Sequence, residues 1–328
     1  MSGTRQGRMS RLLAGAAIAV LVLTQGADAY DSEAAEDAAN GEACEDAQPF
    51  YWEIGGSSGS PIVSGQVGGS TYGRNTVVAI ASASKWIFGA YVIERYGGIP
   101  GGASGADIVA SLDMLNGHTS FSPVLCTITL KVGTCFTIAS NDNVDSGKIG
   151  DFNYGGGDGQ YAAASSGLLG LGNMTKAQLI SEMNSYLSLD GSFAFTNPGV
   201  SGGLQASAAG VAEFLQAIMD GTYEISNYLD YSPVATTCGN CSSPMGSVNM
   251  HYTLNHWIED QTSGTLPHGK TPGTGDGAFS SPGGLGFYPW ITSDLDYYGI
   301  VSREDDTAGS YEDSLICGQA IRAAFLEE

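Results

Sequence analysis

The chain has 328 residues, enough for one large domain, and carries 12 lysines and arginines against 34 aspartates and glutamates. Because a formal net charge of −22 repels phosphate groups, we expect no nucleic-acid partner and no attraction to an anionic membrane surface. An acidic surface of this kind favours solubility.

The beginning of the chain has the three parts of a secretory signal. Its first 11 residues include three arginines, residues 12–23 are apolar but too short to span a bilayer, and Ala27-Asp28-Ala29 is a small-residue cleavage site. We therefore expect a signal peptide over residues 1–29 and a secreted or periplasmic mature protein. No membrane insertion is expected after cleavage.

Beyond the signal, the sequence divides into a leader and one domain. Residues 30–48 are acidic and lack an apolar period, which predicts a flexible leader, and residues 49–328 form the domain.

Apolar periodicity and capping residues predict, in chain order, a strand over 75–81, a helix over 85–96 ended by Gly97, a helix over 107–115, a helix capped by Thr175 and running to 187, a helix capped by Ser207 and running to 219, a strand over 251–257, strands over 284–290 and 297–302, and a helix over 312–326. Since strands come from both ends, the expected fold class is α+β. An antiparallel sheet from both chain ends is flanked by helices and carries a mainly helical inserted subdomain within about residues 98–245.

The six cysteines of an exported chain predict three disulfides. Cys126 and Cys135 flank a short loop, and Cys238 and Cys241 form a C-x-x-C, which leaves Cys44 to pair with Cys317. A redox role for the C-x-x-C is disfavoured because no βαβ pattern surrounds it, and a zinc site is disfavoured because no second cysteine pair lies nearby.

The segment Ser82-Ala83-Ser84-Lys85 lies between the strand and the helix that the sequence predicts over residues 75–96. A serine one helical turn before a lysine places both side chains on one face. The amine of Lys85 can then accept the hydroxyl proton of Ser82, and the helix N-terminus favours the negative charge that develops. This pattern indicates a serine nucleophile activated by a lysine.

Three segments in order resemble the motifs of the β-lactamase-like serine hydrolases, which include class C β-lactamases, DD-peptidases and related esterases. The first is Ser82 to Lys85, the second is Phe152-Asn153-Tyr154-Gly155-Gly156-Gly157, and the third begins Ser280-Ser281-Pro282-Gly283-Gly284. The resemblance covers about residues 50–328 and implies a β-lactamase/transpeptidase-like fold.

The resemblance also implies the role of each motif. Ser82 attacks an acyl carbon, Lys85 accepts its proton, and Tyr154 passes a proton to the leaving group. The backbone N–H groups of Ser82 and Gly284 form the oxyanion hole, and Ser281 and Gly283 belong to the third motif. No cofactor or metal is called for.

Two departures from the family pattern bear on the substrate. Gly156 stands where the second motif has asparagine, and Ser281 stands where the third has a basic residue. Lys270-Thr271-Pro272-Gly273 is an alternative third motif, but proline is disfavoured within a strand, so Ser281 is preferred. The expected activity is therefore hydrolysis of carboxylic esters or small amides through an acyl-enzyme on Ser82. A DD-peptidase or β-lactamase, and a catalytically degenerate binding protein of the same fold, are the alternatives.

Three aromatic residues follow the third motif, namely Phe287, Tyr288 and Trp290. Two interpretations remain open for them: they line an apolar pocket for the acyl group, or they pack in the core.

Overall fold

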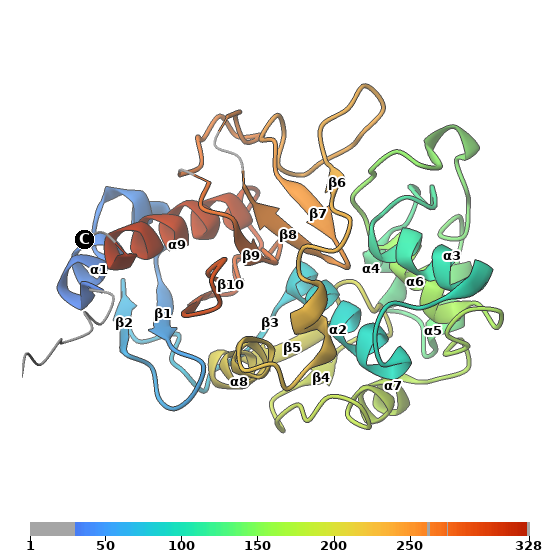
Figure 1. Ribbon diagram of the computed structural model, residues 1–328, viewed down its shortest axis with the longest axis horizontal. Helices are drawn as coiled ribbons and strands as arrows, with labels where there is room; N and C mark the ends of the chain where they lie inside the picture. The colour runs from blue at the N-terminus through green and yellow to red at the C-terminus, as the bar shows by residue number, and fades with distance from the viewer. Residues whose placement is uncertain (1–29, 261–262, 274, 327–328) are drawn as a thin grey trace, which may run out of the picture.

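The computed structural model describes residues 30–260, 263–273 and 275–326, so the expected signal peptide lies outside the described residues. An antiparallel sheet with strand order β2-β1-β11-β10-β9-β8-β7-β6 runs through the molecule (Figure 1). Its strands are β1 (Phe50–Gly55), β2 (Val63–Val67), β6 (Val234–Ala235), β7 (His251–Thr253), β8 (His256–Glu259), β9 (Ala278–Ser280), β10 (Tyr288–Ile291) and β11 (Tyr298–Ser302). The pairing of β1 with β11 confirms that both ends of the domain build the sheet.

Helices cover both faces of this sheet. Along β11, Ile300 packs in one core cluster and Val301 in the other, as expected where successive side chains point to opposite faces. On the Val301 face lies α9 (Ser310–Leu326), and on the Ile300 face lies α8 (Ala208–Met219). Although α8 falls within the span expected for the insert, it packs on the sheet.

The other helices follow in chain order, and several of them form the lobe at the right of Figure 1. They are α2 (Ser84–Tyr96), α3 (Gly102–Leu112), α4 (Pro123–Cys126), α5 (Val132–Thr137), α6 (Gly157–Ala164) and α7 (Lys176–Met183), with the short 3-10 turns η2 (Ala81–Ala83), η3 (Ser146–Lys148) and η4 (Glu224–Tyr228). A small sheet of β3 (Val77–Ala79), β5 (Leu204–Ser207) and β4 (Ala194–Phe195) lies beside α2. No helix in the described part of the chain is both long and apolar enough to cross a membrane.

Local signals in the sequence mark several helix ends correctly. Thr175 forms a capping box with Gln178 at the start of α7, and the Ser207 side chain accepts the Gly210 N–H at the start of α8. Gly97 ends α2 in the left-handed conformation, which glycine adopts at little cost. In contrast, residues 251–257 form the β7–β8 hairpin instead of one strand.

The prediction of a flexible leader over residues 30–48 is wrong. Most of this segment forms α1 (Ser32–Ala39) and η1 (Glu42–Ala47), which pack against α9. The buried side chains of α1 are Ala35 and Ala39, four residues apart, and so small an apolar face gives a weak periodic signal.

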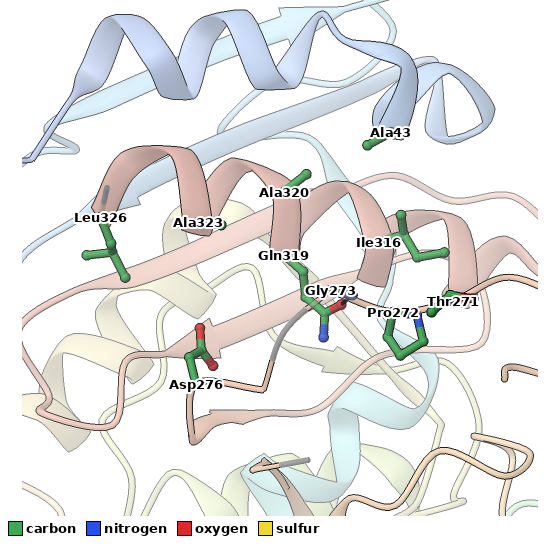
Figure 2. Close-up of a pocket in the computed structure, with 10 residues that line it drawn as sticks. All are labelled: Ala43, Thr271, Pro272, Gly273, Asp276, Ile316, Gln319, Ala320, Ala323 and Leu326. Atoms are coloured by element: carbon green, nitrogen blue, oxygen red, sulfur yellow. Dashed lines mark hydrogen bonds between the residues drawn. The ribbon is translucent and has the colours of Figure 1, made fainter. Parts of the chain in front are cut away.

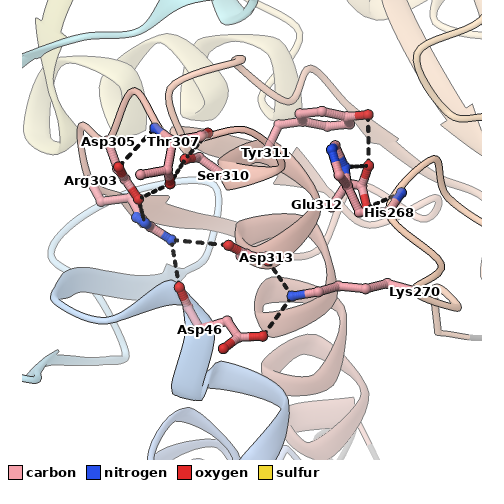
Figure 3. A network of polar contacts seen from close by, with 10 residues as sticks. All are labelled: Asp46, His268, Lys270, Arg303, Asp305, Thr307, Ser310, Tyr311, Glu312 and Asp313. Carbon is pink, nitrogen blue, oxygen red and sulfur yellow. Dashed lines mark hydrogen bonds and ion pairs between the residues drawn. The ribbon is translucent and has the colours of Figure 1, made fainter.

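Ion pairs also hold this segment against the end of the chain (Figure 3). Lys270 bridges Asp46 of η1, at 2.7 Å, and Asp313 of α9. The backbone oxygen of Asp46 also accepts a hydrogen bond from Arg303. The acidic residue Asp46, which suggests a solvated leader when taken alone, therefore has basic partners from the far end of the sequence.

The structure pairs the six cysteines as the sequence predicts, Cys44 with Cys317, Cys126 with Cys135, and Cys238 with Cys241. The first pair joins η1 to α9. The second joins α4 to α5, so short helices occupy the place where the spacing indicates a simple loop.

Candidate active site

The Ser82 turn connects β3 to α2. Ala81 has a φ of 44°, an uncommon conformation for a residue with a side chain, and such residues cluster at functional sites. Ser84 holds the turn, because its buried hydroxyl donates to the Ala81 oxygen at 2.6 Å and accepts the Leu204 N–H at 3.2 Å. Ser82 itself is partly exposed at the beginning of the helix. The turn therefore presents the Ser82 hydroxyl outward from a fixed backbone.

Lys85 lies one turn further along α2, and its side chain is buried. Its Nζ donates to Ser82 Oγ at 2.9 Å and to the backbone oxygen of Ser201 at 2.8 Å. Burial disfavours the charged amine and lowers the pKa of Lys85 to about 7. Close to neutral pH, therefore, a substantial fraction of the amine is able to accept a proton.

Tyr154 lies in a loop. Its N–H donates to the Ser242 oxygen at 2.9 Å, and this hydrogen bond holds the loop beside residue 242. Its ring lies 4.7 Å from Lys85 Nζ and packs with Trp257 and Tyr252. Burial raises the pKa of Tyr154 to about 12, although hydrogen bonds with Ser82 and Trp257 oppose the rise. The phenol therefore holds its proton at neutral pH. The structure brings Ser82, Lys85 and Tyr154 together.

A cavity of about 250 Å³ opens beside these three side chains. Its lining residues come from the Ser82 turn, the Tyr154 loop, the beginning of α4 with the residues just before it, and a glycine-rich segment before β5. They are Ala81, Ser82, Lys85, Phe121, Pro123, Tyr154, Gly155, Gly156, Asn197, Gly199, Ser201, Gly202 and Gly203. The cavity is large enough for a small substrate group next to Ser82.

The third motif lies against the backbone of the Ser82 turn. Ser281 is buried, and its hydroxyl donates to the Ser82 oxygen at 3.2 Å. The Gly283 N–H donates to the Phe287 oxygen at 2.7 Å, so it is already paired, while Gly284 is exposed. A Cβ on Gly283 would lie 2.3 Å from the Ile80 oxygen, so this close approach requires glycine. None of these three residues is among those that line the cavity.

Lys270, the basic residue of the alternative third motif, lies elsewhere, in the ion pairs with Asp46 and Asp313. A second hollow, of about 460 Å³, lies along α9 and has no lining residue in common with the Ser82 cavity (Figure 2). Asp276, which lines this hollow, is paired with Arg322. In the described part of the chain, no cluster of three or more histidine, cysteine or acidic side chains could hold a metal ion.

The pocket interpretation of Phe287, Tyr288 and Trp290 is wrong, since all three are core residues that are at most 1% exposed. The reason is that β10 is covered on both faces. Phe287 packs in the cluster on the α8 side, while Tyr288 and Trp290 pack in the cluster on the α9 side.

Two parts of the site were missed in the sequence. The backbone oxygen of Ser201 binds Lys85, and Phe121 forms part of the cavity wall. The glycine-rich run from Gly199 to Gly203 was the available signal for a close backbone approach. Nothing local marks Phe121, because its position depends on tertiary packing.

No protein-family model matches the sequence, and no curated protein matches it closely enough to count as a relative. Solved structures do match. They include a penicillin binding protein from Bacillus halodurans (11% identity, 86% of this chain and 98% of that chain covered, TM-score 0.58) and EstCE1, described as a hydrolase with promiscuous acyltransferase activity (11%, 90% and 98%, 0.58). A D-stereospecific amidohydrolase from Streptomyces sp. also matches (12%, 88% and 99%, 0.56).

At such low identities these matches establish the fold and nothing finer. They agree with the antiparallel sheet that both ends of the domain build in this chain. The chain therefore has the β-lactamase-like fold that the penicillin-binding proteins and related serine hydrolases share.

Proposed function

We propose that this protein is an exported serine hydrolase that cleaves carboxylic esters or small amides through an acyl-enzyme on Ser82. The observation that carries the proposal is the 2.9 Å hydrogen bond between Ser82 Oγ and Lys85 Nζ, beside a cavity. The pKa of Lys85, which burial lowers to about 7, suits a general base at neutral pH.

The proposed reaction proceeds in two half-reactions. In the first, the Ser82 proton moves to neutral Lys85 as Oγ attacks the acyl carbon, and the Ser82 N–H donates to the oxyanion, with Gly284 as the proposed second donor. One such donor typically lowers the barrier by about 3 kcal/mol. The C–O or C–N bond then breaks, and Tyr154 relays the proton to the departing alcohol or amine. In the second, water attacks the acyl-enzyme and releases the acid and Ser82.

The proposed substrate class follows from what the second and third motifs lack. Gly156 offers no side-chain amide, and the third motif offers Ser281 in place of a basic residue. Neither position can recognise the carboxylate or amide of a penicillin-like substrate in the way that the family pattern does. Esters and simple amides need neither contact, so we favour them over the β-lactamase and DD-peptidase alternatives.

A covalent probe tests this proposal directly. The folded mature protein is treated with a fluorophosphonate, and the modified peptide is identified by mass spectrometry; hydrolysis of p-nitrophenyl butyrate and nitrocefin is measured in parallel. We expect one adduct, on Ser82, and ester turnover well above nitrocefin turnover. Heat-denatured protein is the control and is expected to remain unlabelled. An unmodified Ser82 in folded protein would favour the binding-protein alternative, and rapid nitrocefin turnover would favour a β-lactamase.

The rate is also expected to depend on pH. Lys85 must be neutral to accept the Ser82 proton, and burial lowers its pKa to about 7. The value of kcat/KM for a neutral ester should therefore fall about tenfold for each pH unit below 7 and reach a plateau above about 8. Initial rates between pH 5 and 9, corrected for spontaneous hydrolysis, measure this. A profile that is flat across this range would show that no group with this pKa acts as the base.

A further inference from the structure

One wall of the Ser82 cavity is built by Phe121, which lies just before α4, and Pro123, the first residue of that helix. Asn141, which is fully buried, fixes this segment: its Oδ1 accepts the Ser122 N–H at 2.8 Å, and its Nδ2 donates to the Cys135 oxygen at 2.9 Å. The disulfide between Cys126 and Cys135 also ties α4, which begins at Pro123, to α5. The wall is thus held in place before any substrate arrives.

The ring of Phe121 fills the space beside Gly156. A Cβ at position 156 would lie only 2.7 Å from Cδ1 and Cε1 of this ring, closer than side-chain atoms approach one another. The backbone does not itself demand glycine, because φ is −112° and ψ is −9°. Position 156 is the N-cap of α6, where asparagine is at least as favourable as glycine. The glycine is therefore required by the aromatic ring and not by the backbone.

Apart from Lys85, the described lining residues of the cavity carry no charge. Among its described lining residues, Lys85 has the one charged side chain, and its hydrogen bonds go to Ser82 Oγ and the Ser201 oxygen. No arginine is available there to bind a carboxylate. The ring of Phe121, Pro123 and the backbone of Gly156 instead form part of the cavity wall.

The geometry points to an apolar subsite, formed by Phe121, Pro123 and Gly156, that selects uncharged substrates with an apolar group beside the scissile bond. This inference rests on the proposed function, since it needs Ser82 to attack that bond. Hydrophobic subsites discriminate by about tenfold or more for each methylene that they accept or reject. Phe121 sets the depth of the subsite, because its ring closes the space that position 156 leaves open.

The first test changes the depth of the subsite. Rates of ester hydrolysis are measured for two neutral series, p-nitrophenyl esters from acetate to octanoate and acetate esters of alcohols from ethanol to octanol, and for the anionic p-nitrophenyl succinate. Wild-type protein is expected to prefer butanoate over succinate by at least tenfold. In Phe121→Ala, kcat/KM for the longest ester relative to the ester of middle length should rise about tenfold in one of the two series. The series in which it rises shows whether the subsite binds the acyl side or the alcohol side of the scissile bond. Phe136→Ala is the matched control, because Phe136 lies in the same segment but contacts His118 and Tyr161 and does not line the cavity.

The outcomes separate the two proposals. If turnover depends on Ser82 but Phe121→Ala leaves the preference for ester length unchanged in both series, the inferred subsite is not there and the proposed function stands. If wild-type protein shows no turnover that depends on Ser82, both are wrong. Thermal unfolding of each variant shows that a changed ratio comes from folded protein.

The second test does not rely on Phe121→Ala alone. Gly156→Asn should crowd the ring and lower kcat/KM for butanoate about tenfold, and adding Phe121→Ala should recover most of that loss. Such recovery is a coupling between two positions in contact. If the two substitutions act additively instead, the ring and position 156 do not share space, and the inference is overturned.

Discussion

Replacing Ser82 with alanine is expected to lower kcat/KM for p-nitrophenyl butyrate by about 10⁴–10⁶-fold, because it removes the hydroxyl that we propose forms the acyl-enzyme. Stability should hardly change. The Ser82 side chain is partly exposed, and Lys85 keeps its hydrogen bond to the Ser201 oxygen. Steady-state kinetics and thermal unfolding of the Ser82→Ala variant measure both effects.

Ser84→Ala is the matched control, two residues away in the same turn. Its hydroxyl is fully buried and bonds the Ala81 oxygen and the Leu204 N–H, so its loss should cost about 1–3 kcal/mol of stability. Because only a support of the turn is lost, we expect this variant, once folded, to lose far less turnover than Ser82→Ala. If Ser82→Ala retained turnover while Ser84→Ala lost it, the nucleophile would be misassigned.

Removing the charge of Arg322 is expected to have the largest effect on stability. This side chain is 1% exposed, and it pairs with Glu259, which is fully buried, at 2.8 Å and with Asp276 at 2.6 Å. Burial raises the pKa of Glu259, but Arg322 and the surrounding hydrogen bonds outweigh this effect and hold it below its usual value. In Arg322→Met the carboxylate would remain buried without its partner, which costs about 3–5 kcal/mol.

Urea denaturation followed by circular dichroism measures this loss. Arg95→Met is the control, because Arg95 is half-buried and lies 3.7 Å from Glu182, and a pair of this kind contributes about 1 kcal/mol or less. Adding Glu259→Met to Arg322→Met should recover part of the stability, since no unpaired carboxylate then remains at that position. A loss below about 1 kcal/mol in Arg322→Met would show that the ion pair is not needed.

The sequence predicted those parts of the molecule that depend on short-range chemistry. Caps such as Thr175 and Gly97 act within one helical turn, so their effect can be recognised without tertiary structure. The Ser82–Lys85 pair is likewise set by helical spacing, and the structure places its two polar atoms 2.9 Å apart. The resemblance to a known family supplied the fold class, which the structural matches confirm.

Other features could not be predicted because they depend on residues far apart in the chain. The N-terminal segment is ordered by α9, about 280 residues away, and the small side chains of Ala35 and Ala39 leave little hydrophobic signal. Phe287 and Trp290 were open to two interpretations because an apolar strand is equally suited to core and pocket. The close approach of Phe121 to Gly156 could not be predicted because the two residues are far apart in the chain.

The bond between Cys44 and Cys317 has a consequence for how the chain is made. It spans 273 residues and encloses both other disulfides. Cys44 emerges early in synthesis, and Cys126 becomes available as a wrong partner long before Cys317 exists. The segment that contains Cys44 is therefore among the last to be joined by its native disulfide. We expect high yields of active protein to require a compartment or host that reshuffles disulfides as well as one that forms them.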